Sequence, residues 1–116
     1  MKREAAEARG RWAEARAADY LRREGWQILG QRLRTPAGEV DIVARKGRTL
    51  AFVEVKARGS AAALDLALDR RRLVRVAGAA EILLPRFARA DDDIRIDAIL
   101  IGPGGLPRHL EHVWQG

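Results

Sequence analysis

The chain opens with a segment whose apolar spacing is that of an amphipathic helix. Residues 4–24 have helix-forming composition, and apolar side chains recur along one stripe at Trp12, Ala13, Ala17, Tyr20 and Leu21. Gly25 follows, at a position where a left-handed cap costs little. The pattern predicts a helix that ends at Gly25 and packs this stripe against the core.

Three strand-like segments come next. Residues 26–34 are compatible with a β-strand, and the stretch 35–38 (Thr-Pro-Ala-Gly) is typical of a turn. The runs GEVDIVARK (38–46) and TLAFVEVKA (49–57) are rich in Val, Ile and Phe, and only Gly47-Arg48 separates them. We therefore expect one strand followed by a tight β-hairpin.

The second half of the chain repeats the alternation of helix and strand. Helical spacing returns over 65–84, and Pro85 is expected to stop this second helix. IRIDAILIG (94–102) and RHLEHVW (108–114) predict a fourth and a fifth strand. The order α-β-β-β-α-β-β predicts an α/β fold with a mixed sheet, and a chain of 116 residues fits one domain over 1–116.

The hairpin carries the candidate chemistry. Side chains alternate between the faces of a strand, so a two-residue loop places odd positions of 38–46 opposite even positions of 49–57. Asp41 then faces Phe52 or Glu54, and Glu54 and Lys56 share its side of the sheet. A three-residue loop would separate the two carboxylates. The loop length therefore decides whether these residues form a site.

Two acids and a lysine on one face of an apolar hairpin are costly unless something uses them. Mg²⁺ favours one or two carboxylates together with waters and substrate phosphates, and a nearby lysine can assist attack by water on a phosphodiester. The alternative is an ordinary cross-strand ion pair of Lys56 with Asp41 or Glu54, worth about 0.2–1 kcal/mol. The spacing alone leaves both interpretations open.

The composition of the chain limits which kinds of partner and metal ion it is expected to bind. The chain has 22 Lys and Arg against 16 Asp and Glu, a net charge of +6 and a pI near 10.9, and only three of its basic residues are lysines. Guanidinium groups pair bidentately with phosphate, so we expect a nucleic acid as the partner; a GC-rich genome explains the arginine bias but not the excess charge. Without cysteine, a metal must be hard and held by carboxylates, His109 or His112.

Nothing in the chain resembles a membrane segment. No apolar run approaches the length of a span, and the basic start lacks the apolar stretch of a secretory signal. We expect no membrane partner and a cytoplasmic location.

Two motifs carry a resemblance to a known family. GEVDIVA (38–44) followed by FVEVKAR (52–58) looks like the GEIDLIA…FVEVKxR signature of the bacterial YraN family, UPF0102. That family resembles the archaeal Holliday-junction resolvases and the PD-(D/E)xK nuclease superfamily, whose signature is an acid and then an acid-x-lysine on the next strand. The similarity runs from about residue 10 to residue 97. It implies a restriction-endonuclease-like mixed sheet.

The resemblance also implies a site. Asp41 and Glu54 become metal-binding acids and Lys56 the catalytic lysine, with Mg²⁺ or Mn²⁺ as cofactor. Glu14 matches the family pattern of the first helix and lies on its packed stripe, three residues before Ala17, which makes it a further candidate ligand; alternatively it pairs with a nearby arginine such as Arg11 or Arg58.

Six arginines are candidates for contacts with phosphate. The resemblance implies basic residues at both Arg34 and Arg58, which flank the hairpin. Arg70, Arg71, Arg72 and Arg75 crowd the first turns of the second helix, where the macrodipole disfavours cations by about 0.3–1 kcal/mol each, so an anionic partner would stabilise them. The alternative is a solvated basic turn that Asp69 caps. Gln31-Arg32 departs from the family pattern, which has an arginine-asparagine pair at this position.

The sequence therefore predicts a metal-dependent endonuclease-like protein that acts on DNA, branched or otherwise structure-specific. Related resolvases pair as two-fold dimers, so a homodimer is a further expectation. The rival interpretation keeps the fold and the basic surface but has no turnover: a module that binds nucleic acid or a partner.

Overall fold

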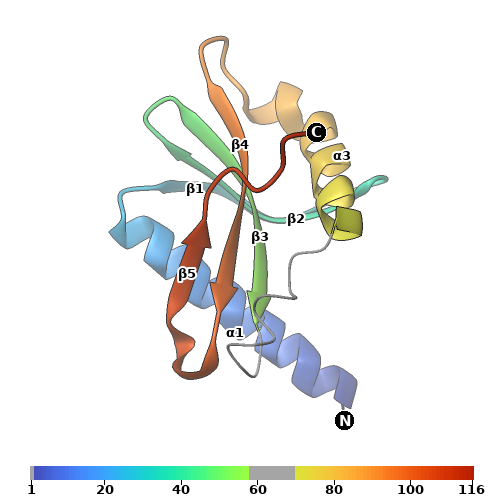
Figure 1. Cartoon of the computed structure of the whole chain (residues 1–116), viewed down its shortest axis with the longest axis vertical. Coiled ribbons are helices and arrows are strands. Elements are labelled where there is room, and N and C mark those ends of the chain that lie inside the picture. Colours follow the sequence, from blue (N-terminus) through green and yellow to red (C-terminus); the bar gives the residue numbers. More distant parts are fainter. Residues whose placement is uncertain (1, 58–69) are drawn as a thin grey trace.

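One five-stranded sheet with a helix on each face makes up the computed structural model, which describes residues 2–57 and 70–116 (Figure 1). The strands lie side by side in chain order: β1 (Gln27–Thr35), β2 (Gly38–Lys46), β3 (Thr49–Ala57), β4 (Asp93–Ile101) and β5 (Pro107–Leu110). Only β3 and β4 pair in parallel. The predicted order α-β-β-β-α-β-β and the mixed sheet are confirmed.

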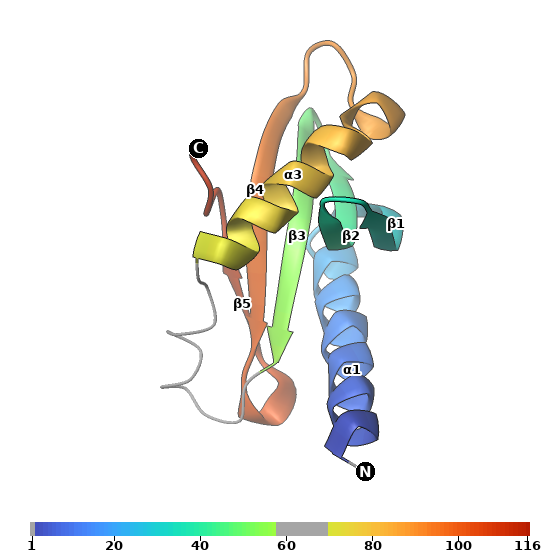
Figure 2. The ribbon, with the colours of Figure 1, turned by 90° about the vertical axis from the view of Figure 1, so that its right-hand side faces the viewer.

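Helices α1 (Lys2–Arg23) and α3 (Arg70–Phe87) cover opposite faces of this sheet (Figure 2). Alternation along β3 divides the core between them. Ala51 and Val53 pack with the α1 side, whereas Leu50 and Phe52 pack with the α3 side. All four are almost completely buried, so β3 is the central strand and its polar residues need partners inside the protein.

Helix α1 ends where the sequence predicts. Gly25 adopts φ +92°, and the Trp26 amide donates to the Leu21 carbonyl at 2.9 Å, which closes the last turn. Ala13, Ala17 and Leu21 are buried as expected. Trp12 is not, because 45% of it is exposed; the helix turns only its alanine-rich side toward the sheet, where small side chains allow a close approach. The prediction for Trp12 was wrong.

The β2–β3 hairpin has the bounds and the loop that the sequence predicts. Lys46 pairs with Thr49, Gly47-Arg48 forms the two-residue loop, and Gly47 takes φ +61°, which other residues rarely accept. The register continues to Ile42 opposite Val53. Asp41 and Glu54, each one residue farther, therefore lie on the same face of the sheet.

Beyond Ile42 and Val53 the two strands part, and we call this point the fork. Strand β2 stays paired with β1 as far as Gly38, whereas β3 stays paired with β4 as far as Ala57. Figure 1 shows the ends of β2 and β3 diverging. The Val55 amide faces the side that β2 has left, and the Asp41 carboxylate accepts its hydrogen bond at 2.8 Å. The Asp41 side chain thus accepts the hydrogen bond that a backbone carbonyl of β2 would accept if the two strands stayed paired.

Two predicted boundaries were wrong. Helix α3 runs through Pro85 to Phe87, and the Ala88 amide still bonds to the Leu84 carbonyl at 2.8 Å. Pro85 removes only one helical hydrogen bond, to Glu81, and the helix ends two residues later, so the cost is small. Residues 65–69 of the predicted helix lie outside the described residues.

The fifth strand ends at Leu110 instead of reaching residue 114. His112 turns the chain with φ +54°, and its amide donates to Asp97 at 3.0 Å. Val113 and Trp114 then pack against the cluster under α3. The fully buried Asp97 also accepts bonds from Arg95 and His109, so it fixes the end of the chain to β4. Within the described part of the chain, no helix is long and apolar enough to cross a membrane.

Candidate functional site at the fork of the sheet

Two carboxylates meet at the fork. Asp41 is half-buried at the point where β2 leaves the ladder, and Glu54 on β3 is only 4% exposed. Both line a hollow of about 360 Å³, which we call the fork hollow, together with Gly38, Glu39, Arg72, Arg75 and Val76. The convergence that the hairpin parity predicts is therefore present, and the carboxylates open to a space large enough for an ion with its waters.

The electrostatics of Asp41 are unfavourable without a cation. Burial raises the pKa of Asp41, the neighbouring Glu54 carboxylate raises it further, and the hydrogen bond from the Val55 amide lowers it; the resulting pKa is about 8. Asp41 forms no ion pair with any described residue, and its Oδ1 accepts no hydrogen bond from one. At neutral pH the side chain therefore holds a proton that a positive charge would displace.

Glu54 is better compensated. Its Oε1 lies 3.1 Å from Lys56 Nζ and 2.9 Å from Arg72 Nη2, so two cations from two elements meet one carboxylate oxygen. An ion pair of Glu54 with Lys56 was the alternative to a metal site, but both residues lie on β3, so the pair runs along one strand instead of across two, and both side chains are at most 10% exposed. A buried pair of this kind is weak evidence for a purely stabilising role.

Lys56 also opens toward α1. It lines a second space of about 240 Å³, the Lys56 hollow, with Ala6, Arg9, Gly10, Val55 and Ala57. Lys56 therefore joins the fork acids to the side of the molecule that α1 covers.

Glu14 lies near these acids but in a different hollow. Its Oε1 accepts a hydrogen bond from Arg32 Nε at 2.8 Å, and both residues line a space bounded by Arg11, Arg34 and Glu39. Its charge contributes to the raised pKa of Asp41, after burial and Glu54. Among residues 2–57 and 70–116, no group of three or more Asp, Glu or His side chains is close enough to share an ion. The metal-ligand role of Glu14 stays a prediction.

The comparisons with known proteins agree with the motifs. The model of a family described as "Uncharacterised protein family UPF0102" matches residues 13–101. A UPF0102 protein of Sphingopyxis alaskensis is 69% identical, and one of Rhizorhabdus wittichii 55% identical, each over 99% of this chain and 98–99% of its own length. A UPF0102 protein of Erythrobacter litoralis is 53% identical over 99% of both chains.

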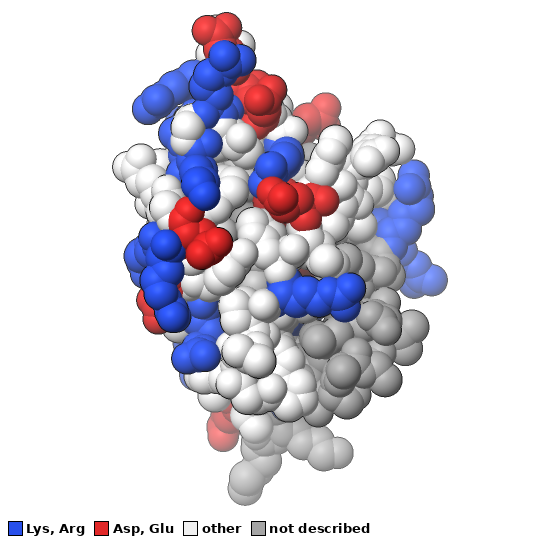
Figure 3. All heavy atoms as spheres, turned by 60° about the vertical axis from the view of Figure 1, so that its left-hand side comes forward, with Lys and Arg blue, Asp and Glu red and all other residues white. Residues whose placement is uncertain are grey.

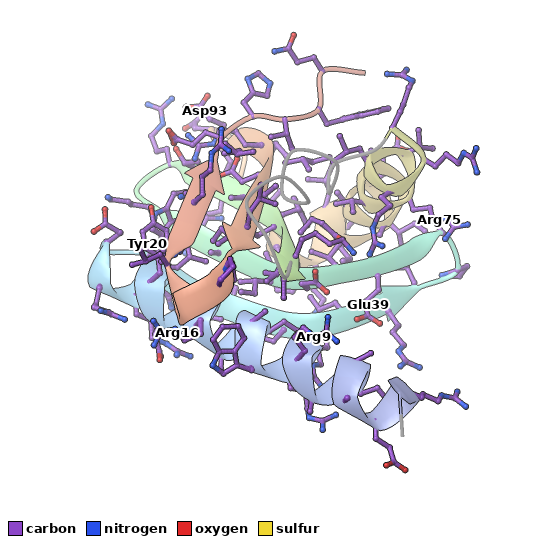
Figure 4. All side chains as sticks on the ribbon, turned by 60° about the horizontal axis from the view of Figure 1, so that its bottom comes forward. Arg9, Arg16, Tyr20, Glu39, Arg75 and Asp93 are labelled. Carbon is purple, nitrogen blue, oxygen red and sulfur yellow. The ribbon has the colours of Figure 1, made fainter. Side chains whose placement is uncertain are left out.

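The chain belongs to the UPF0102 family. In this UPF0102 protein, helix α3 places two arginines at the site. Arg72 and Arg75 of α3 line the fork hollow, and Figure 4 shows Arg75 and Glu39 near the start of β2. Gly38 permits this approach, since a Cβ there would lie 3.1 Å from the Arg75 carbonyl oxygen.

The other predicted arginines are dispersed. Arg34 pairs with Glu39 at 3.2 Å on the exposed rim, Arg70 stacks over Trp114 at 4.9 Å from the ring centroid, and Arg71 points to solvent. Arg58 lies outside the described residues. Of the four predicted arginines on α3, the structure thus brings only Arg72 and Arg75 to the carboxylates.

Sequence reasoning missed Arg32. Its φ of +52° is rare for a residue with a side chain, and this conformation accompanies its bond to Glu14. The only signal in the sequence is the departure from the family pattern at Gln31-Arg32, and a backbone angle cannot be inferred from such a departure. Arg11, one of the partners predicted for Glu14, does not take this place among the described contacts, and Arg58, the other, lies outside the described residues.

The donor set at the fork fits a hard divalent cation. Mg²⁺ is usually held by one or two carboxylates and completes its shell with waters and substrate phosphates. Asp41 and Glu54 supply two carboxylates whose mutual repulsion a cation would relieve, and Arg72 and Arg75 extend the hollow with groups that bind phosphate. A cage made wholly of protein ligands, as structural Ca²⁺ sites have, does not fit the described residues.

Proposed function

We propose that this UPF0102 protein is a divalent-metal-dependent endonuclease that hydrolyses phosphodiester bonds of DNA, branched or otherwise structure-specific. One observation carries the proposal: Asp41 and Glu54 share the fork hollow, and burial together with Glu54 raises the pKa of Asp41 to about 8. Because the two carboxylates repel each other in one hollow, a bound divalent cation would stabilise both. The PD-(D/E)xK resemblance supplies the reaction class.

Each residue has a role that its position supports. Asp41 and Glu54 hold Mg²⁺ or Mn²⁺, which when bound lowers the pKa of water and offsets charge on the phosphate. Lys56 Nζ lies 3.1 Å from Glu54 Oε1; as an ammonium it can orient the attacking water, and only as the neutral amine can it receive the proton of that water. Arg72 and Arg75 hold the phosphate from the α3 side of the hollow. Glu14 is a candidate for a further ligand once Arg32 turns away.

The substrate follows from charge and from the resemblance. A net charge of +6, carried almost entirely by arginine, suits a polyanion. The likeness to junction resolvases favours DNA with a branch, cut by a homodimer in the cytoplasm; the dimer and the location are part of this proposal.

The test is a cleavage assay on a four-way junction, a duplex and a single strand, with Mg²⁺ or Mn²⁺, for the wild type and Asp41→Asn. We expect metal-dependent cutting of at least one substrate and a loss of about a hundredfold or more in Asp41→Asn, because the ion loses a ligand. Asp91→Asn makes the same substitution in an exposed loop away from the site and should cut normally. Absence of cutting with every substrate and both ions would contradict the proposal.

A second function has its own supporting observation. Lys56 and Arg72 already satisfy Glu54 Oε1 without a metal, which suits a protein that only binds nucleic acid. Such a module would bind DNA with the same affinity in Mg²⁺ and in EDTA, and Asp41→Asn would leave that affinity unchanged. A metal-dependent gain in affinity for an uncut analogue would instead support the nuclease.

A further inference from the structure

Helix α1 presents a large aromatic side chain to solvent between two arginines. Trp12 is 45% exposed, although its neighbour Ala13 is buried against the sheet. Arg9 stands three residues before it and Arg16 four residues after it, so the three lie along one side of the helix. We call them the Arg9–Trp12–Arg16 stripe. The stripe ends before Asp19, an acid three residues after Arg16 that pairs with Arg22.

The stripe begins at the candidate site. Arg9 lines the Lys56 hollow with Val55 and Lys56 itself, so this end of the stripe shares a space with the lysine of the fork. Figure 4 shows Arg9 and Arg16 spaced along α1, with Arg16 below the turn between β4 and β5. A strand of nucleic acid that leaves the Lys56 hollow along α1 would therefore meet Arg9 first, then Trp12.

The far end of the stripe is held in place. Arg16 donates from Nε and Nη2 to the Gly105 carbonyl at 3.3 and 3.1 Å, which fixes its guanidinium against the turn. The next residue of that turn, Leu106, is 77% exposed and adds apolar surface beside α1. Trp12 thus stands between a cation at the hollow and a cation already ordered by the fold.

Alternation of cations with an exposed aromatic ring is the chemistry that holds unpaired nucleotides. Bases stack on aromatic rings whatever their sequence, and arginines follow the backbone phosphates. At 1.5 Å per residue, Arg9, Trp12 and Arg16 are spaced by about 4.5 and 6 Å along the helix axis, comparable with one or two nucleotides of a stacked strand. A base paired in a duplex offers no free face to such a ring.

We propose that the Arg9–Trp12–Arg16 stripe binds an unpaired segment of the nucleic acid next to the bond that is cut, with one base stacked on Trp12. The inference rests on the proposed function for its substrate and deepens it: the substrate class becomes DNA that has a single-stranded segment beside the cleavage site. On the face that Figure 3 shows, basic side chains are spread out instead of gathered in one patch, so an aromatic contact is what gives this stripe its preference.

Tryptophan fluorescence tests the stripe without any cutting. In EDTA, the wild type is titrated with an oligothymidylate, with an abasic oligonucleotide of the same length, and with a duplex. We expect quenching by the thymidylate and little by the other two. Trp26 is buried and Trp114 is half-buried over Arg70, so the quenching should vanish in Trp12→Phe, which keeps a ring for stacking.

Affinity gives the second readout. Trp12→Ala should bind the thymidylate about fivefold or more weakly, the lower end of what one base stack contributes, whereas Trp12→Phe should stay within about threefold of the wild type. Arg9→Gln should weaken binding, and its matched control Arg3→Gln should not, because Arg3 lies on another side of α1 and pairs with Glu7. Equal binding of the thymidylate and the abasic strand, or unchanged affinity in Trp12→Ala, overturns the inference.

The two proposals fail separately. Cleavage that depends on Asp41 but not on Trp12 overturns the stripe and leaves the nuclease. Binding that depends on Trp12, with no cutting under any metal, supports the stripe and overturns the nuclease.

Discussion

Asp41 carries the largest electrostatic cost at the fork. The Asp41 carboxylate has lost part of its hydration in a half-buried position beside Glu54. The single hydrogen bond from the Val55 amide compensates for only part of this lost hydration. Glu54 differs because Lys56 and Arg72 already balance its charge. The two acids are therefore unequal: two cations pair with Glu54, whereas Asp41 has a raised pKa and is the group that we expect to lose its proton when a cation binds.

Metal binding should therefore depend on pH in a defined window. The folded protein holds the Asp41 proton up to about pH 8, so below that pH each bound ion must displace one proton. We expect the apparent affinity for Mn²⁺ to rise about tenfold per pH unit between pH 6 and 8 and to level off above it. Calorimetric titrations at several pH values measure this. A flat profile across pH 6–8 would contradict the assigned role of Asp41.

The fork depends on how two strands choose their partners. Strand β2 leaves β3 to stay with β1, and β3 leaves β2 to stay with β4, so a side chain, Asp41, has to satisfy the Val55 amide. Helix α3 then reaches the same place through Arg72 and Arg75. The site is thus formed by several elements. The arginines of α3 should therefore differ in their effect on DNA binding, according to whether they point into the fork hollow.

Arg72 and Arg71 provide a matched pair for this idea. Both carry one charge on the first turn of α3, but only Arg72 lines the fork hollow and bonds to Glu54. We expect Arg72→Ala to weaken binding of an uncut DNA analogue and to lower its salt slope by about 1, and Arg71→Ala to change neither beyond the general loss of charge. Fluorescence anisotropy at several salt concentrations measures both. Equal slopes for the two variants would show that the hollow is not where phosphate binds.

Local rules predicted the hairpin and the pairing of its acids. Gly47-Arg48 fixes the loop, the loop fixes the register, and the register brings Asp41 to Glu54. What depends on packing could not be predicted: periodicity finds the stripe of α1 but not its width, so Trp12 was placed in the core. Likewise, Pro85 does not end the helix, because a proline in the last turn removes only one hydrogen bond. The positive φ of Arg32 could not be predicted, because no feature of the neighbouring sequence indicates it.

The molecule as a whole has a net charge of +6, and on the face that Figure 3 shows its cations are dispersed. Besides Lys56 on β3, Arg9 of α1 lines the Lys56 hollow, and Arg72 and Arg75 of α3 line the fork hollow, so a bound strand would cross the open end of the sheet between the two helices. Affinity would then be the sum of many weak contacts between basic side chains and phosphates. Added salt should weaken all of these contacts.

DNA affinity should therefore fall steeply with salt. If about four phosphates are neutralised, the dissociation constant rises by about a hundredfold between 50 and 200 mM salt, from a slope near −0.9 per contact in duplex DNA. Asp41→Asn, which should bind without cutting, is the form to titrate. A slope shallower than −1 would mean that the basic surface does not bind phosphate.

The most direct test of the metal site is anomalous scattering from crystals soaked in Mn²⁺. The account predicts one peak in the fork hollow, within bonding distance of carboxylate oxygens of both Asp41 and Glu54, and no such peak in Asp41→Asn crystals treated in the same way. Saturating Mn²⁺ that leaves this hollow without a peak, or that is found only at other residues, would contradict it.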